Sequence, residues 1–315
     1  MTDVVGSYFG LREFRAHDGK LLMNNIPLYL KMLLDQGYWT ESGITPPSEE
    51  AIIKDIELTK QMGYNAVRKH QKTEDERFYY YADIMGLCVW CELPSNHWYG
   101  DEANHRIMHE WTDIVREYYN FPSLIVWVIF NESWGVRNIA MDPIQQNLAN
   151  GLYWLTKSFD TMRPVISNDG WVHTMSDILT LHHYEQDPKN FMMRYDTPEK
   201  LVEGWYKNGQ HLPYAFGYEY EGQPIIMSEF GGTAYDKDTE KGWGYGCAVK
   251  NDQEYLDRFK GLVQACMMMP GVVGYCYTQT TDVQQEVNGV LREDRTCKVD
   301  IEAIRKINEN EFIEG

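Results

Sequence analysis

Two glutamates, Glu132 and Glu229, each stand at the end of a long apolar run. Glu132 follows residues 124–131, and Glu229 follows residues 224–228 and precedes two glycines. Apolar runs of this kind are typical of strands buried on both faces, as in a parallel sheet. Because a (β/α)8 barrel carries its chemistry at the carboxyl ends of its strands, both glutamates are candidate catalytic groups. Two carboxylates that face one cavity are the minimum needed to cleave a glycosidic bond.

The elements that would position these glutamates alternate between strand-like and helix-like patterns. Eight strands are predicted at residues 28–33, 65–68, 87–92, 124–130, 165–167, 178–181, 224–228 and 272–277. Helices are predicted at residues 104–119, 145–159, 252–269 and 301–310, with two more running from Ser48 to Gly63 and from a Thr73-x-x-Glu76 capping box to Gly86. Eight alternating units predict the fold class α/β, a (β/α)8 TIM barrel rather than a doubly wound sheet. Glu132 and Glu229 then close the fourth and seventh strands, which can face each other across the barrel mouth.

The first 27 residues do not follow this alternation. Asp18-Gly19 is a hairpin turn signal, and Asn24-Asn25 is a second candidate turn. Residues 4–15 resemble an extended strand that has nothing nearby to pair with. We therefore predict a strand and hairpin segment at residues 1–27, left from a preceding domain, and the barrel at residues 28–315.

Composition limits the partners of the chain. Its 315 residues include 47 acidic and 29 basic side chains, which give a net charge of -18. This acidic balance disfavours nucleic acid and anionic membranes as partners. No apolar run approaches the length that spans a membrane, and no signal peptide or targeting segment is visible, so a cytoplasmic location is expected.

Aromatic residues make up 14% of the chain, and several tryptophans flank the predicted strand ends: Trp39, Trp98, Trp134, Trp171 and Trp243. Sugar rings present apolar C–H faces that lie well on indoles. Aromatic side chains beside acidic ones therefore favour a carbohydrate ligand over a phosphate or a metal.

The six cysteines show no paired framework. Cys88 and Cys91 have the spacing of a metal or redox motif, but they lie in an apolar run and point to opposite faces of a strand. No second pair exists to complete a zinc site. Both are predicted to be free thiols of the core.

Several segments, in order along the chain, resemble the catalytic barrel of glycoside hydrolase family 2, which includes β-galactosidases, β-glucuronidases and β-mannosidases. The resemblance extends from Gly10-Leu-Arg-Glu13 through the eighth strand. Its most specific segments are Gly63-Tyr-Asn-Ala-Val-Arg68-Lys-His70, Ala82-Asp83-x-x-Gly86-Leu, Asn131-Glu132-Ser and Ser228-Glu229-Phe-Gly.

The resemblance implies a role for each residue that matches the family pattern. Glu132 would be the acid/base, and Glu229 the nucleophile that forms a covalent glycosyl-enzyme. Asn131 would hydrogen-bond the sugar 2-hydroxyl. Tyr184 matches the family tyrosine that touches the nucleophile.

Four further residues are predicted to bind the substrate. Arg68 and His70 match an Arg-x-x-His-like motif after the second strand, and an arginine there can orient a carboxylate through its rigid fork. A structural ion pair under the site is the alternative for these two residues. Trp171 is either a platform for the sugar or a lid on the core. Tyr277 lies on the eighth strand near the position of a family tryptophan.

Three departures from the family pattern narrow the substrate. Residues 287–290 lack the lysine of the Asn-x-Lys that holds the sugar carboxylate in β-glucuronidases, which disfavours glucuronate. Pro94, two residues after Glu92, replaces the histidine of the magnesium-binding Glu-x-His of β-galactosidases, so neither a metal nor another cofactor is expected. Gly232 stands where that type has another histidine.

These observations predict a retaining exo-β-glycosidase that acts on terminal neutral β-sugars, β-galactosides first. The alternatives are β-mannosidase or β-glucosidase specificity with the same mechanism, or a carbohydrate-binding barrel with weak catalysis. Family members normally carry β-sandwich domains before the barrel. Residues 1–27 are therefore interpreted as the remnant of such a domain in a longer parent protein, and the oligomeric state is left open.

Overall fold

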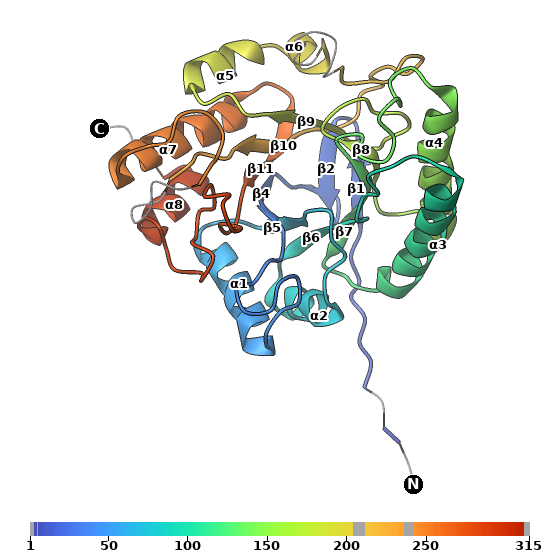
Figure 1. The fold of residues 1–315 in the computed structure, drawn as a ribbon, viewed down its shortest axis with the longest axis horizontal. Coiled ribbons are helices and arrows are strands. Elements are labelled where there is room, and N and C mark those ends of the chain that lie inside the picture. Colours follow the sequence, from blue (N-terminus) through green and yellow to red (C-terminus); the bar gives the residue numbers. More distant parts are fainter. Residues whose placement is uncertain (1–2, 5, 204–211, 236–241, 312–315) are drawn as a thin grey trace.

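The centre of the molecule is an eight-stranded parallel sheet that curls into a barrel (Figure 1). The structure is a computed structural model, and it describes residues 3–4, 6–203, 212–235 and 242–311. The barrel strands are β4 (Leu30–Asp35), β5 (Ala66–Lys69), β6 (Cys88–Glu92), β7 (Leu124–Asn131), β8 (Val165–Asp169), β9 (Leu179–His183), β10 (Ile225–Gly231) and β11 (Val272–Thr278). All eight predicted strands are present, which confirms the (β/α)8 TIM barrel.

The strands pair in the order β8-β7-β6-β5-β4-β11-β10-β9. Each strand therefore lies beside its neighbour in sequence, and β11 returns to β4, as a closed barrel requires. Among the described residues, no backbone ladder joins β8 to β9. We call this junction the β8–β9 seam.

Helices surround the barrel (Figure 1). They are α1 (Glu49–Gln61), α2 (Glu76–Met85), α3 (Asp101–Tyr118), α4 (Pro143–Phe159), α5 (Pro188–Arg194), α6 (Pro198–Glu203), α7 (Asp252–Met268) and α8 (Ile301–Asn308). The short helices α5 and α6 were not predicted. Within the described ranges, no helix is long and apolar enough to cross a membrane.

The starts of α1 and α2 test the predicted helix caps. Ser48 caps α1 as expected, because its hydroxyl accepts a hydrogen bond from the amide of Ala51. The predicted capping box of α2 is wrong, since Asp75 rather than Thr73 accepts from the first turn. Thr73 instead donates its hydroxyl to the carbonyl of Glu92, 3.3 Å away, at the end of β6.

A small antiparallel sheet precedes the barrel. It consists of β1 (Phe14–His17), β2 (Lys20–Met23) and β3 (Ile26–Pro27). The two predicted turns join these strands, with positive φ at all four turn residues. The expectation of an unpaired strand over residues 4–15 is wrong: among its described residues only the last two are in a strand, and that strand pairs with β2.

The hairpin packs against the amino-terminal end of the barrel. Phe14 and Leu21 belong to the buried cluster that also holds Leu30 and Ile125, near the starts of β4 and β7. Arg12 holds the segment before β1 against the loop that precedes β7, because its side chain donates a hydrogen bond to the carbonyl of Pro122 at 2.7 Å. The hairpin thus contributes side chains to the interior of the barrel, while the domain division at residue 27 stays a prediction.

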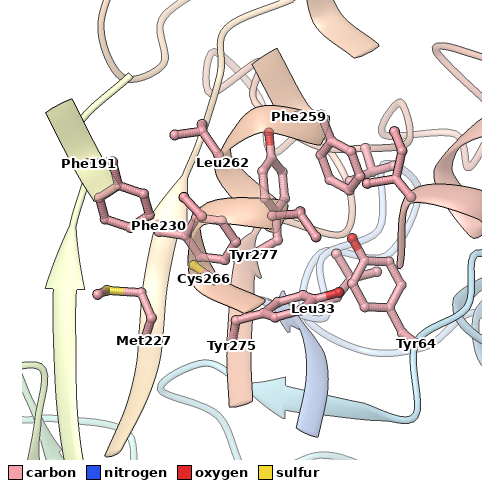
Figure 2. Close-up of a cluster of buried hydrophobic side chains, with 14 of the residues drawn as sticks. Leu33, Tyr64, Phe191, Met227, Phe230, Phe259, Leu262, Cys266, Tyr275 and Tyr277 are labelled. Carbon is pink, nitrogen blue, oxygen red and sulfur yellow. The ribbon is translucent and has the colours of Figure 1, made fainter. Parts of the chain in front are cut away.

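The outward side chains of the barrel strands pack against the helices. Around β10 and β11, aromatic rings from both strands meet those of α5 and α7 (Figure 2). On the opposite side, Cys91 is buried and Cys88 is partly buried, and both are free thiols as predicted. Burial raises the pKa of Cys91 to about 12, so its thiol stays protonated.

Candidate active site

A bulge in β10 turns Glu229 toward the barrel axis. Ile226 belongs to the interior cluster and Met227 to an outer one, so regular alternation would point Glu229 outward. The register with β9 shifts between Met227 and Glu229. A bulge of this kind inserts one residue and redirects the side chains that follow. Glu229 therefore faces inward, and Phe230 packs outward.

Glu132 leaves the end of β7 in a left-handed turn. Its φ is 51° and that of Ser133 is 61°, values that are uncommon outside glycine. The amide of Glu132 donates to the carbonyl of Asp169 at 3.0 Å, and the amide of Ser133 donates to the side chain of Asn168 at 2.9 Å. Such strain costs about 1–3 kcal/mol per residue and persists where neighbours impose it. These hydrogen bonds fix the direction of the Glu132 carboxylate.

The two glutamates meet at the barrel mouth. One carboxylate oxygen of each lies within 4.8 Å of the other. Carboxyl groups about 5–5.5 Å apart characterise retaining glycosidases, whereas inverting enzymes need about 6.5–9.5 Å. The Glu132 side chain is 27% exposed, and that of Glu229 is 6% exposed. Burial raises the pKa of Glu229, against the opposing positive charges of His182 and Arg68.

Arg68 lies beneath both glutamates and is fully buried. Its guanidinium binds Glu92, Glu229 at 2.9 Å, Asp169 at 2.8 Å and the amide oxygen of Asn131 at 2.8 Å. Burial opposes its charge, but the carboxylates outweigh this and hold the pKa of Arg68 well above its ordinary value. This is the alternative that the sequence left open, an ion-pair centre under the site and out of reach of a substrate.

Arg68 also orients Asn131 and His70. Because the amide oxygen of Asn131 accepts from Arg68, its amide nitrogen is the group turned away from the guanidinium. The Nδ1 atom of His70 lies 3.2 Å from Arg68. Burial, followed by the charge of Arg68, holds the pKa of His70 well below its usual value, so the ring is neutral and accepts this hydrogen bond.

A cleft of about 1070 Å³ opens beside Glu132, at the upper end of the usual range for small-molecule sites. Tyr184 and Trp171 line it. The Tyr184 hydroxyl donates to Glu229 at 2.5 Å, and its ring stacks on that of Tyr245 with centroids 3.4 Å apart. Trp171 packs edge-on against the His182 ring, so it forms part of the cleft wall and also covers His182.

Tyr277 lies away from the cleft. The interior cluster contains Cys276, so its neighbour Tyr277 points outward toward α7. The Tyr277 ring is fully buried, with centroids 5.4 Å from Phe230 and 4.8 Å from Phe259 (Figure 2). The prediction that Tyr277 contacts a substrate is therefore not retained.

Sequence reasoning missed two residues of this site, His182 and Asp169. His182 lies 2.8 Å from Glu132 through Nδ1 and 2.7 Å from Asp169 through Nε2. Both residues lie at the carboxyl ends of barrel strands, β9 and β8. That position was the available signal, since polar residues there are where barrels place their chemistry.

Glu132, His182 and Glu229 also bring three possible metal-ligand atoms within 4.8 Å of one another. However, both ring nitrogens of His182 face carboxylate oxygens, and the charges around it raise its pKa to about 10 despite burial. A ring protonated at both nitrogens has no lone pair for a metal. The arrangement is therefore suited to holding and moving protons.

A parallel barrel with two carboxylates at the ends of opposing strands has the design of a glycoside hydrolase barrel. Residues 14–255 match the family model described as Glycosyl hydrolases family 2, TIM barrel domain. The chain belongs to this family.

Named relatives agree with this family. The chain is 33% identical over 314 residues to a beta-galactosidase of Lactococcus lactis subsp. lactis. The matched region covers 92% of this chain and 28% of that relative. It is 26% identical over 261 residues to a beta-galactosidase of Photobacterium profundum, with coverage of 80% and 22%. The chain therefore spans about a quarter of the length of these relatives.

Solved structures share the fold. A GH2 beta-galacturonidase from Eisenbergiella tayi bound to galacturonate superimposes with a TM-score of 0.76 at 19% identity. The match covers 96% of this chain and 55% of that one. At this identity the likeness shows the barrel and does not identify a substrate.

Proposed function

We propose that this barrel is a retaining exo-β-glycosidase that hydrolyses terminal neutral β-sugars by double displacement. The observation that carries the proposal is the approach of Glu132 and Glu229 to within 4.8 Å. Glu229 attacks the anomeric carbon while Glu132 donates a proton to the departing oxygen. Glu132 then removes a proton from the water that hydrolyses the glycosyl-enzyme.

The environments of the two carboxylates support this division of roles. Glu229 is buried, and its two oxygens are held by Arg68 and Tyr184, which fixes a nucleophile in one orientation. Burial and the Glu229 carboxylate hold the pKa of Tyr184 well above its usual value, so the hydroxyl keeps the proton it donates. Glu132 is more exposed and lines the cleft, where a leaving group can reach it.

Two of the remaining predicted residues are assigned to substrate binding. The amide nitrogen of Asn131 is oriented to donate to the sugar 2-hydroxyl, a contact that strengthens in the transition state. Trp171 offers its indole to the sugar at the cleft wall. Arg68 and His70 act from below, through the groups they orient.

β-Galactosides are the first candidate substrates, because relatives that cover most of the chain are named beta-galactosidase. The cleft also contains more carboxylates than cations, with Glu185, Asp187 and Asp257 against Arg258, which disfavours a uronate. β-Mannosides and β-glucosides are the alternative glycones for the same mechanism. A carbohydrate-binding barrel with weak catalysis is the alternative from another class.

The parent protein is part of the proposal. We infer that β-sandwich domains precede this barrel in a longer chain, since it spans about a quarter of its curated relatives. The cytoplasmic location stays a prediction, and the oligomeric state stays open.

A panel of nitrophenyl β-glycosides tests the activity and the sugar. We expect turnover of the β-galactoside and its loss in Glu229→Gln. Equal turnover by both proteins would contradict the assignment of the nucleophile. Turnover of none of the panel by the wild type would favour the carbohydrate-binding alternative.

Azide rescue tests the mechanism. In Glu229→Ala, azide is expected to enter from the face that the carboxylate has vacated and to give a glycosyl azide of inverted configuration. In Glu132→Ala, azide is expected to intercept the glycosyl-enzyme and to give a retained product. The opposite pairing of products would exchange the two roles.

A further inference from the structure

His182, on β9, contacts carboxylates at the ends of three other barrel strands, β7, β8 and β10. Its Nε2 atom lies 2.7 Å from Asp169 at the end of β8. Its Nδ1 atom lies 2.8 Å from Glu132 after β7 and 3.6 Å from Glu229 on β10. Arg68, from β5, approaches Nε2 to 3.5 Å. The His182 side chain is 1% exposed, so bulk water does not screen these charges.

The carboxylates on both sides of the ring favour protonation of both its nitrogens. A neutral imidazole has one N–H and can donate to only one of the two carboxylates it touches. A ring protonated at both nitrogens donates to Asp169 and to Glu132 at once. Burial opposes this charge, but Glu229, Asp169 and the two hydrogen bonds raise the pKa of His182 to about 10. The other nearby ring, His70, is neutral and adds no competing charge.

The structure around the ring is shaped to hold it. Gly170 has a φ of 96°, and a Cβ atom there would lie 2.5 Å from the His182 ring. Trp171 covers the ring from the cleft side, with centroids 5.5 Å apart. Both the position and the charge of His182 are therefore imposed by its neighbours.

We propose that His182 is a positioning residue that binds the acid/base and the nucleophile with one positively charged ring and thereby sets the pH range of catalysis. This inference rests on the roles proposed for Glu132 and Glu229. Asp169 helps Glu229 to keep the ring charged, and it orients the ring through the contact with Nε2.

The proposal has a pH signature that a purely structural role lacks. A buried positive charge favours the ionised form of each carboxylate it contacts. When the charge is removed, the nucleophile Glu229 loses a group that lowers its pKa and ionises only at higher pH. The lower limb of the kcat/KM profile, which reports ionisation of the nucleophile, therefore moves upward by about one pH unit or more, the effect of one opposite charge at this range.

The first experiment compares pH profiles of His182→Gln and His182→Phe with the wild type. The glutamine variant retains a donor without charge, and the phenylalanine variant retains only the ring. His173→Gln is the matched control, because His173 is also buried beside β9 but contacts Thr180 rather than either glutamate. We expect the lower limb to shift upward in the two His182 variants and to stay in place in the control. A lower limb that stays in place or moves downward in the His182 variants would overturn the proposal.

The second experiment is independent of turnover and of the fate of the His182 variants. The ¹⁵N shifts of the His182 ring are followed by NMR from pH 5 to 9 in the wild type and in Asp169→Asn. We expect both nitrogens to remain protonated throughout in the wild type and the ring to deprotonate within this range in the variant. Wild-type titration near 6.5 would refute the proposal. A wild-type ring that stays charged in a protein that cleaves no glycoside would instead refute the proposed function alone.

Discussion

Two buried histidines next to the β8–β9 seam, His173 and His182, should affect stability with opposite dependence on pH. Burial lowers the pKa of His173 to about 4, whereas an unfolded histidine has a pKa of about 6.5. As the pH falls below 6.5, the unfolded chain binds a proton that the folded chain excludes. The free energy of unfolding then drops by about 1.4 kcal/mol per pH unit, or about 2 kcal/mol between pH 6.5 and 5.

His182 should make the free energy of unfolding depend on pH in the opposite direction. Its pKa is raised to about 10, so the folded chain retains a proton that the unfolded chain releases above pH 6.5. The stabilisation from His182 is complete below pH 6.5 and is lost as the pH rises toward 10. Between pH 6.5 and 8 this loss amounts to about 2 kcal/mol, by the same slope of about 1.4 kcal/mol per unit.

Urea unfolding of the wild type, His173→Gln and His182→Gln at pH 5, 6.5 and 8 measures both effects. Each substitution also removes hydrogen bonds, but that cost is common to every pH and cancels when one protein is compared across the series. We expect the acid-side loss of stability to shrink by about 2 kcal/mol in His173→Gln, a measurable part of a total of about 5–15 kcal/mol. The advantage of the wild type over His182→Gln should shrink from pH 6.5 to 8. A His173→Gln curve parallel to the wild type on the acid side would refute the reasoning for His173, and a constant difference on the alkaline side would refute it for His182.

Three further substitutions test other parts of the structure. Tyr184→Phe removes a hydrogen bond to the charged Glu229, worth about 1.5–3 kcal/mol, so kcat/KM should fall roughly ten- to hundredfold; an unchanged value would argue against that contact in catalysis. Arg68→Met leaves the buried Glu92 without its counter-charge and leaves Asp169 and Glu229 with His182 alone, so it should cost at least about 3–5 kcal/mol of stability, and an unchanged Tm would contradict the ion-pair centre. Phe14→Ala should cost about 3–5 kcal/mol with little change in kcat, while Phe9→Ala, at an exposed position, should cost almost nothing; equal Tm values would show that the hairpin does not share the barrel core.

The barrel could be predicted because its strands are buried on both faces. Continuous apolar runs such as residues 124–130 mark such strands directly, and eight of them alternating with helical patterns leave few other topologies. The short helices α5 and α6 escaped prediction because six or seven residues contain too little of the helical period to be recognised. The start of α2 was displaced because Thr73 bonds to a strand that is distant from the helix in sequence.

The same burial explains why side-chain directions were harder to predict. In a strand that is apolar on both faces, no polar alternation tells which residues point inward, so the sequence did not reveal that Tyr277, predicted to bind the substrate, points outward. Glu229 points inward only because β10 has a bulge. Glu132 is oriented because its own amide and that of Ser133 donate hydrogen bonds to two residues of β8. His182 and Asp169 join adjacent strands through their side chains. The presence of polar residues at strand ends does not by itself predict which of them will meet.

The β8–β9 seam differs from the other strand junctions of the barrel in what holds it together, and it should therefore open differently. Seven strand junctions are closed by backbone ladders, whereas this one is bridged by groups such as the Thr180 hydroxyl, which accepts from the Gly170 amide at 2.9 Å, and by the pair of His182 and Asp169. The pair of His182 and Asp169 carries charge, so the junction can be loosened by the loss of a proton and not only by heat. Local amide hydrogen exchange should therefore begin here and should quicken at alkaline pH as His182 loses its charge. Substitutions that change the pH range of catalysis by altering the charge of His182 would then also change the stability of the β8–β9 seam.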